Sequence, residues 1–149
     1  KFVYENADEM RILAVDGSDV QIATNPNDSS SYHPGSNGQK PYNLLHLNAL
    51  FDLTHKIYVD AVIQGRMDRN EHSALQKMVD CSSIPKALVI ADRGYESYNN
   101  MAHIIEKGSR FLIRIRDISS RGNMLSGLKL PSSEEFDIDI INLNHCYQY

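Results

Sequence analysis

The hydrophobic pattern is strongest at residues 87–91, where five apolar residues run without interruption into Asp92. A short continuous apolar run is typical of a strand that is buried on both faces of a parallel sheet. The pattern therefore predicts a central strand whose carboxyl end carries Asp92. Residues 11–16 repeat the arrangement, because four apolar residues are followed there by Asp16 and Gly17. They predict a first strand.

Two segments between these strands alternate apolar and polar residues with a period of two. Residues 45–53 and residues 57–64 both show this alternation, and the short turn at 54–56 joins them. Such a pair predicts a β-hairpin with one buried face and one largely polar face. We expect Asp52 and Asp60 to lie on the polar face, in contact with solvent.

Apolar residues recur at helical spacing in two other segments. Residues 71–80 show this spacing directly after Asn70, whose side chain is suited to cap a helix. Residues 98–107 show it after Ser97, and Gly108 follows at the position where a glycine commonly ends a helix. The sequence therefore predicts two helices, one that precedes the strand ending at Asp92 in the sequence and one that follows it.

The remaining segments predict loops and two further strands. Residues 24–42 are rich in Asn, Ser, Pro and Gly and predict a long loop. Residues 110–116 alternate apolar and polar side chains and predict a strand, and residues 134–143 do the same. Residues 117–133 show no periodicity and predict a loop between them.

The order of the predicted elements is strand, hairpin, helix, strand, helix, strand. We expect the first three strands to pair antiparallel and the later strands to form parallel α/β units. This order is similar to that of the ribonuclease H-like fold, so the expected fold class is α/β with a mixed sheet. In that fold the first strand and the strand after the first helix lie side by side, which would make Asp16 and Asp92 neighbours.

Composition narrows the class of protein. The 149 residues suffice for one domain with a real core, and 42% are hydrophobic and 23% charged. No apolar stretch approaches a membrane span, and residues 1–10 lack the apolar centre of a signal peptide. Cys81 and Cys146 are too few for a disulfide framework, so we expect a cytoplasmic protein. The net charge of −4 is not typical of a free-standing nucleic-acid binder.

Two carboxylates at adjacent strand ends indicate a metal site. Close carboxylates repel each other unless one takes up a proton or both bind a cation. Mg²⁺ and similar hard cations prefer oxygen ligands, and two such ions can clamp the attacking and leaving oxygens of a phosphodiester displacement. Asp16 and Asp92 are the expected ligands. Asp19 follows closely on the first of them and is an alternative to Asp16.

The block ALVIADRGYESY, with the helix and the strand predicted after it, resembles the second-aspartate region of bacterial DDE transposases of the insertion-sequence-four type. RILAVDGSDV resembles the first-aspartate strand of the same family, and the resemblance spans residues 11–117. It implies a catalytic core that cleaves DNA at transposon ends and joins the 3′ hydroxyl to target DNA. It also implies that Asp16 and Asp92 are catalytic and hold Mg²⁺ or Mn²⁺, with two ions in the full-length enzyme.

The resemblance implies DNA as the partner, at transposon ends and at the target, rather than a small-molecule substrate or a membrane. It further implies a homodimer when full-length, acting at the bacterial nucleoid. Arg93, Arg114 and Arg116 are candidate contacts to DNA phosphates, since phosphate neutralisation supplies much of such affinity. A solvated surface role for these arginines stays open.

The third acid of the family is a glutamate within a Tyr-Arg-Glu-Lys signature, beyond an inserted β-rich segment. No part of this sequence matches that signature, and Glu134 and Glu135 lie in a strand pattern. We therefore expect residues 1–117 to be an incomplete catalytic core and residues 118–149 the start of the insertion. The chain by itself is expected to be inactive.

Other functions are weighed against this one. An aspartate-nucleophile phosphatase needs two aspartates separated by one residue, whereas Asp16 and Asp19 are separated by two and point to opposite faces of a strand. No glycine-rich phosphate loop is present. A catalytically inactive remnant or interaction module that keeps the fold stays open. The six histidines show no ligand spacing and are expected to be structural or to lie on the surface. Tyr95 and Tyr98 are expected to pack at helix edges.

Overall fold

The computed structural model describes residues 10–117 and 124–125, and the structural statements below concern those residues. In chain order the elements are the strands and helices β1 (Arg11–Ile22), β2 (Tyr32–His33), β3 (Tyr42–Asp52), β4 (Ile57–Gln64), α1 (Glu71–Cys81), β5 (Ala87–Ala91), the 3₁₀ turn η1 (Arg93–Tyr95), α2 (Tyr98–Glu106) and β6 (Arg110–Ile113). The predicted strand at 134–143 and the boundary at 118 lie outside the described residues.

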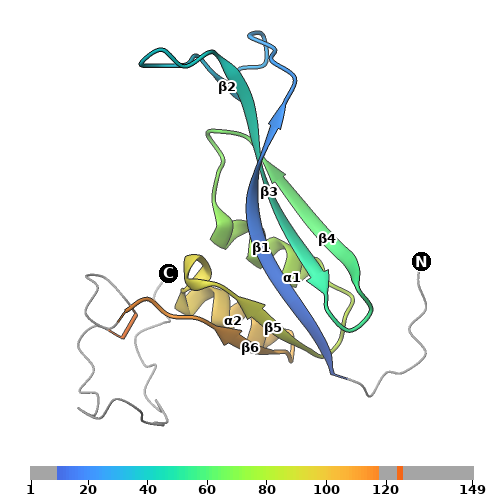
Figure 1. Cartoon of the computed structure of the whole chain (residues 1–149). Helices are drawn as coiled ribbons and strands as arrows, with labels where there is room; N and C mark the ends of the chain where they lie inside the picture. The colour runs from blue at the N-terminus through green and yellow to red at the C-terminus, as the bar shows by residue number, and fades with distance from the viewer. Residues whose placement is uncertain (1–9, 118–123, 126–149) are drawn as a thin grey trace.

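The strands form one mixed sheet (Figure 1). β3 pairs antiparallel with β1 along one edge and with β4 and β2 along the other. β1 pairs parallel with β5, and β5 pairs parallel with β6. The predicted arrangement of an antiparallel first half and a parallel second half is therefore confirmed. The first strand and the strand after the first helix are neighbours, as expected.

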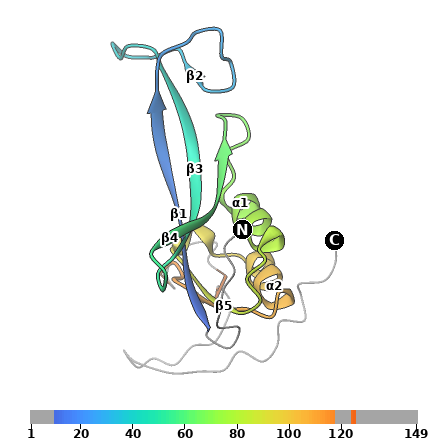
Figure 2. The same ribbon diagram turned by 90° about the vertical axis from the view of Figure 1, so that its right-hand side faces the viewer.

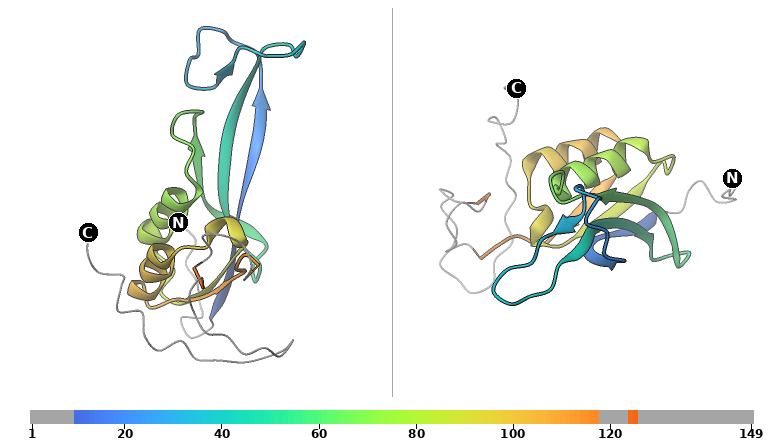
Figure 3. Two further views of the ribbon diagram at one scale, coloured as in Figure 1. Left: turned by 90° about the vertical axis from the view of Figure 1, so that its left-hand side faces the viewer. Right: turned by 90° about the horizontal axis from the view of Figure 1, so that it is seen from above.

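Both helices cover the same face of the sheet, as Figures 2 and 3 show. Asn70 caps α1, because its side chain accepts a hydrogen bond from the Ser73 amide at 3.0 Å. Ser97 occupies the cap position of α2 without a side-chain bond, and Gly108 lies beyond the end of that helix with a φ of +69°. None of the described helices is long and apolar enough to cross a membrane.

The hydrophobic core lies between the helices and the covered face of the sheet. Every second residue of β5 and of β1 as far as Val15 points into it, and α1 contributes the residues of one stripe. The buried members are Leu13, Val15, Leu50, Leu75, Met78, Val79, Ile84, Ala87, Val89, Ala91, Tyr95 and Ile104. In β5 the alternate residues Leu88 and Ile90 are only half-buried, and Tyr58, Ile63 and Leu112 are exposed on the opposite face. The expectation that β5 is fully buried on both faces is therefore wrong for the described residues.

β1 is twice as long as the sequence pattern predicts. Its apolar run ends at Asp16, but the strand continues to Ile22 because its backbone stays paired with β3, as far as the partners Ile22 and Asn43. The result is a two-stranded ribbon that extends past the helices (Figure 1). The predicted loop at 24–42 contains the short strand β2. β6 ends at Ile113, earlier than predicted, although exposure alternates along residues 110–116.

The buried face of β3 is the polar one, which reverses the expectation for the hairpin. The register pairs Leu50 with Val15 and Asn48 with Gly17, so the even-numbered residues of β3 point toward the helices. His46, Asn48 and Asp52 are all buried, and Asp52 is fully buried and bonded to the guanidinium of Arg11. The prediction that Asp52 is solvated is therefore wrong. Asp60, on β4, is half-buried.

Candidate active site

The parallel pairing of β1 and β5 brings the two predicted acids to one edge of the sheet. Val15 and Ala91 are register partners, and Asp16 and Asp92 are the residues that follow them. Adjacent strands are separated by roughly 4.8 Å, so the two acids lie side by side where the pairing of β1 with β5 ends, Asp16 within β1 and Asp92 directly after β5. Val15 and Ala91 are buried, whereas both aspartates are exposed.

Each aspartate uses one carboxylate oxygen in a local bond. Asp16 Oδ1 accepts from the Gly17 amide at 2.9 Å, and Asp92 Oδ1 accepts from the Arg93 amide at 2.6 Å, which caps η1. Within the described residues, no hydrogen bond or ion pair ends on Oδ2 of either aspartate. Two exposed carboxylates, each with one oxygen that accepts no hydrogen bond in the described residues, fit a hard divalent cation that keeps several of its waters.

A complete ligand set is not assembled in the described part of the chain. There, no three side chains of His, Cys, Asp or Glu converge in an arrangement that could hold a metal ion. Asp16 and Asp92 supply two ligands. The fit of a cation to this edge therefore rests on the donor chemistry of the pair.

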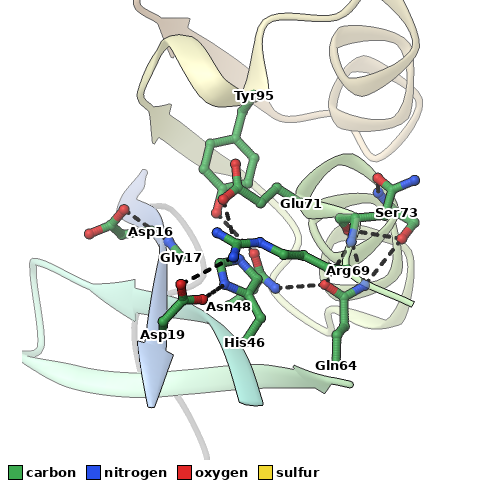
Figure 4. Close-up of polar contacts among 11 residues, drawn as sticks. Asp16, Gly17, Asp19, His46, Asn48, Gln64, Arg69, Glu71, Ser73 and Tyr95 are labelled. Atoms are coloured by element: carbon green, nitrogen blue, oxygen red, sulfur yellow. Dashed lines mark hydrogen bonds and ion pairs between the residues drawn. The ribbon is translucent and has the colours of Figure 1, made fainter. Parts of the chain in front are cut away.

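Asp19, the alternative to Asp16, lies on the other face of β1. Its Oδ1 is 2.7 Å from His46 Nδ1, and its Oδ2 accepts from Arg69 at 3.1 Å. The bond to His46 lowers the pKa of Asp19 most, and burial opposes this effect while the Arg69 charge adds to it. Asp19 is thus engaged with two cationic or donor groups on the helix side. Figure 4 shows Asp16 on the far side of β1 from this group.

Glu71 lies close to the residues that follow Asp16 and Asp92, a position that the sequence pattern did not single out. It is the first residue of α1, and its Oε1 is 3.2 Å from His46 Nε2. His46 Nε2 is buried and makes no well-aligned hydrogen bond, so this contact is an ion pair by distance alone. Glu71, His46, Asp19 and Arg69 form a charged group, which we call the Asp19–Glu71 cluster (Figure 4).

Two glycines leave the space that Glu71 occupies. A Cβ atom at Gly94 would lie 2.9 Å from Glu71 Oε2, and one at Gly17 would lie 3.1 Å from Glu71 Oε1 and 2.8 Å from His46 Nε2. A side chain at Gly94 would therefore collide with Glu71 of α1, and one at Gly17 would meet His46 and Asn48 of β3 as well as Glu71.

Tyr95 ties the turn after Asp92 to the middle of the sheet. Its side chain is 2% exposed, and its hydroxyl donates to Asn48 Oδ1 at 3.2 Å. Asn48 in turn donates to Gln64 Oε1 at 3.0 Å, and Gln64 donates to the Asn70 carbonyl at the start of α1 at 3.1 Å. A packing role for Tyr95 was expected, but this hydrogen-bond chain through β3 and β4 was not.

Tyr95 predicts a fall in stability at alkaline pH. Burial, together with the charges of Glu71 and Asp16, raises its pKa well above the usual value of about 10. Above pH ~10 the unfolded chain loses this proton while the folded chain keeps it, so stability that is complete below pH ~10 declines as the pH rises. Urea unfolding between pH 8 and 11 should show a steeper decline for the wild type than for Tyr95→Phe. Parallel curves would contradict this.

The three arginines predicted to contact DNA are all exposed. Arg93 begins η1 directly after Asp92. The Arg114 amide donates to the Ala91 carbonyl at 3.1 Å, so this arginine leaves the sheet beside the residue that precedes Asp92. The Arg116 amide donates to Glu96 Oε2 at 2.7 Å. Arg93 is thus next to Asp92 in the sequence, and Arg114 is near it through the pairing of β6 with β5. Arg116 lies two residues beyond Arg114.

A cavity of about 170 Å³ opens beside the Asp19–Glu71 cluster, under the β1–β3 ribbon. It is lined by Asp19 and by four groups that are cationic or become so on protonation: His33, His46, Arg66 and Arg69. Arg66 donates to the Tyr32 carbonyl at 3.4 Å, so its guanidinium lies against β2, which pairs with β3. Positive groups therefore lie on the helix side of β1 as well as beside Asp92.

The topology and the paired strand ends together define a ribonuclease H-like α/β protein: three antiparallel strands, a helix, and a parallel strand that returns beside the first. Comparison of the sequence with known families gives the more specific assignment. The chain belongs to the family described as transposase DDE domain, which matches residues 7–134. Neither the curated proteins nor the solved structures gave a match. Membership implies a transposase-type enzyme that acts on DNA, in a family that generally uses divalent metal ions.

Proposed function

We propose that this chain supplies the first two acidic residues, Asp16 and Asp92, to the metal-dependent cleavage and transfer of DNA strands. The observation that carries the proposal is the parallel register of β1 and β5, which puts both acids directly after paired residues at one sheet edge. The family assignment supports the same reaction class. The narrower resemblance to transposases of the insertion-sequence-four type is part of the proposal.

In this mechanism Asp16 and Asp92 would hold Mg²⁺ or Mn²⁺. Such an ion, when bound, would supply Lewis-acid stabilisation of the charge that develops at a DNA phosphate. The protein's own contribution is rigidity, because the local bonds to Gly17 and Arg93 fix the orientation of both carboxylates. A divalent cation also offsets the repulsion between the two negative charges.

DNA phosphates are proposed to contact the arginines around this edge. Arg93 and Arg114 extend from the end of β5 and from the end of β6, and both are free to reach a backbone that passes Asp92 because both are exposed. Arg116 would contact the same DNA backbone at a greater distance from Asp92. Local positive groups of this kind reconcile DNA binding with a net charge of −4, since phosphate contacts act within about 10 Å at 0.1 M salt. A homodimer is expected of the full-length protein.

Titration with Mn²⁺ tests the proposal directly. We expect the wild-type chain to bind Mn²⁺ weakly, because two carboxylates hold a cation less well than three. Asp92→Ala and Asp16→Ala should each remove this binding, as followed by the electron paramagnetic resonance signal of free Mn²⁺. Asp60→Ala serves as the matched control, because Asp60 lies away from the edge, on β4, and should bind like the wild type. Equal Mn²⁺ affinity in the wild type and Asp92→Ala would contradict the proposal and favour the alternative of a catalytically inactive protein that keeps the fold.

A further inference from the structure

We propose that Glu71 is a positioning residue that fixes the spacing between the part of β1 that carries Asp16 and the turn after β5 that carries Asp92. The proposal rests on the function proposed above, because the spacing matters only if both aspartates hold a cation. Glu71 belongs to α1 and not to either strand. It would therefore set the geometry of the candidate site from outside it.

The first argument is the position of the carboxylate between the two glycines. Oε1 faces Gly17, which directly follows Asp16, and Oε2 faces Gly94, two residues after Asp92. The carboxylate oxygens lie 3.1 Å and 2.9 Å from where the Cβ atoms of larger residues would stand. One carboxylate therefore lies close to both segments, in space that glycine leaves open at each of them.

The second argument is that Glu71 is held in place. His46 Nε2 lies 3.2 Å from Oε1, and the His46 side chain is only 3% exposed. His46 is fixed in turn by Asp19 at 2.7 Å, and Asp19 by Arg69 at 3.1 Å. The Asp19–Glu71 cluster therefore joins β1, β3 and α1, and its contacts hold the Glu71 carboxylate near Gly17 and Gly94.

The third argument is electrostatic. Glu71 and Asp16 both act on the Tyr95 hydroxyl, where their charges add to burial in raising its pKa. The negative charge of Glu71 is therefore felt close to the turn that carries Asp92. A fixed charge there attracts a cation to the pair without ligating it. Outer residues of this kind are commonly worth about 10–100-fold in metal affinity.

Gly94→Ala separates a positioning role from a merely structural one. Among the described residues, Glu71 Oε2 is the single heavy atom within 4 Å of a Cβ at this position, apart from the chain neighbours, and φ lies in the ordinary range. The added methyl group would displace the end of one side chain and no backbone atom, at the expense of the contact between Glu71 and His46, so stability should change little. Mn²⁺ affinity should fall about tenfold, because the displaced carboxylate no longer supports the two segments.

A double-mutant cycle completes the test. Glu71→Ala should weaken Mn²⁺ binding to a similar extent, and Gly94→Ala should add no further loss in the Glu71→Ala background, because the group it displaces is gone. Glu106→Ala, an exposed glutamate on α2, is the matched control and should bind like the wild type. Thermal unfolding of every variant shows whether the fold is kept.

The outcomes distinguish the two proposals. If wild-type binding does not depend on Asp92, the proposed function fails. If binding depends on Asp92 but Gly94→Ala keeps wild-type affinity for Mn²⁺, the positioning role is overturned. It is also overturned if Gly94→Ala lowers the affinity equally in the presence and in the absence of Glu71. Should Glu71→Ala fail to fold, Gly94→Ala and Glu71→Gln decide. Wild-type affinity in both would overturn the role, and weakened affinity in Gly94→Ala with the fold kept would support it.

Discussion

Replacing Asp52 by alanine is expected to lower the free energy of unfolding by roughly 3–5 kcal/mol. Asp52 is fully buried at the end of β3 and is bonded to the guanidinium of Arg11 at the start of β1. Its Oδ1 also accepts from the backbone amides of Thr54 at 2.8 Å and His55 at 3.0 Å. The substitution removes the carboxylate from a buried cation and from the turn between β3 and β4 at once.

Urea unfolding followed by circular dichroism measures this loss. Asp60→Ala is the matched control, since this aspartate on the neighbouring strand is half-buried and accepts from the amide of the next residue, Ala61, at 2.7 Å. Its loss should cost about 1 kcal/mol or less. Equal losses for the two variants would show that the contact between Arg11 and Asp52 contributes no more than a local turn.

The largest expected effect on activity belongs to Asp16→Asn and Asp92→Asn in the full-length protein. Each substitution keeps the size of the side chain but removes a charged oxygen ligand from the proposed cation site. Metal ions supply several kcal/mol to phosphoryl chemistry, so cleavage of a transposon end should slow by ~10³-fold or more. Single-turnover cleavage of an end-containing duplex, in Mg²⁺ and in Mn²⁺, measures the rate.

Two further arms make this experiment decisive. Asp19→Asn should slow cleavage far less, by about tenfold at most, because Asp19 lies on the opposite face of β1 and acts on the site only through His46 and Glu71. The 149-residue chain alone should not cleave DNA, since no third ligand joins the pair among the described residues. Full activity in Asp92→Asn, or metal-dependent cleavage by the chain alone that Asp16→Ala abolishes, would contradict this account.

The arrangement of the sheet could be predicted because its main determinants are local. The apolar runs before Asp16 and Asp92 mark strands, the periodic segment after Asn70 marks a helix, and the order of the elements then allows few topologies. The pairing of β1 with β5 follows from that order. The extension of β1 to Ile22 could not be predicted in this way, because backbone pairing with β3 and not burial keeps residues 17–22 extended.

The buried polar residues could not be predicted, because their partners lie far away in the sequence. Asp52 looks like a solvated residue until Arg11, on another strand, is placed opposite it. His46 and Glu71 come from different elements, and only the packing of α1 against β3 brings them together. The one local signal was a polar residue at every second position around His46 and Asn48. It indicated a shared face but not which face is covered.

The register between β1 and β5 has a consequence for how the gene can vary. Side chains alternate along β1, so one residue gained or lost between Arg11 and Asp16 would turn the acid from the open face to the helix face while leaving the strand itself intact. The same holds for residues 87–91 before Asp92. We therefore expect homologues to differ in length in the loop at 23–31 or 34–41, and to keep a constant count in the five positions that precede each aspartate.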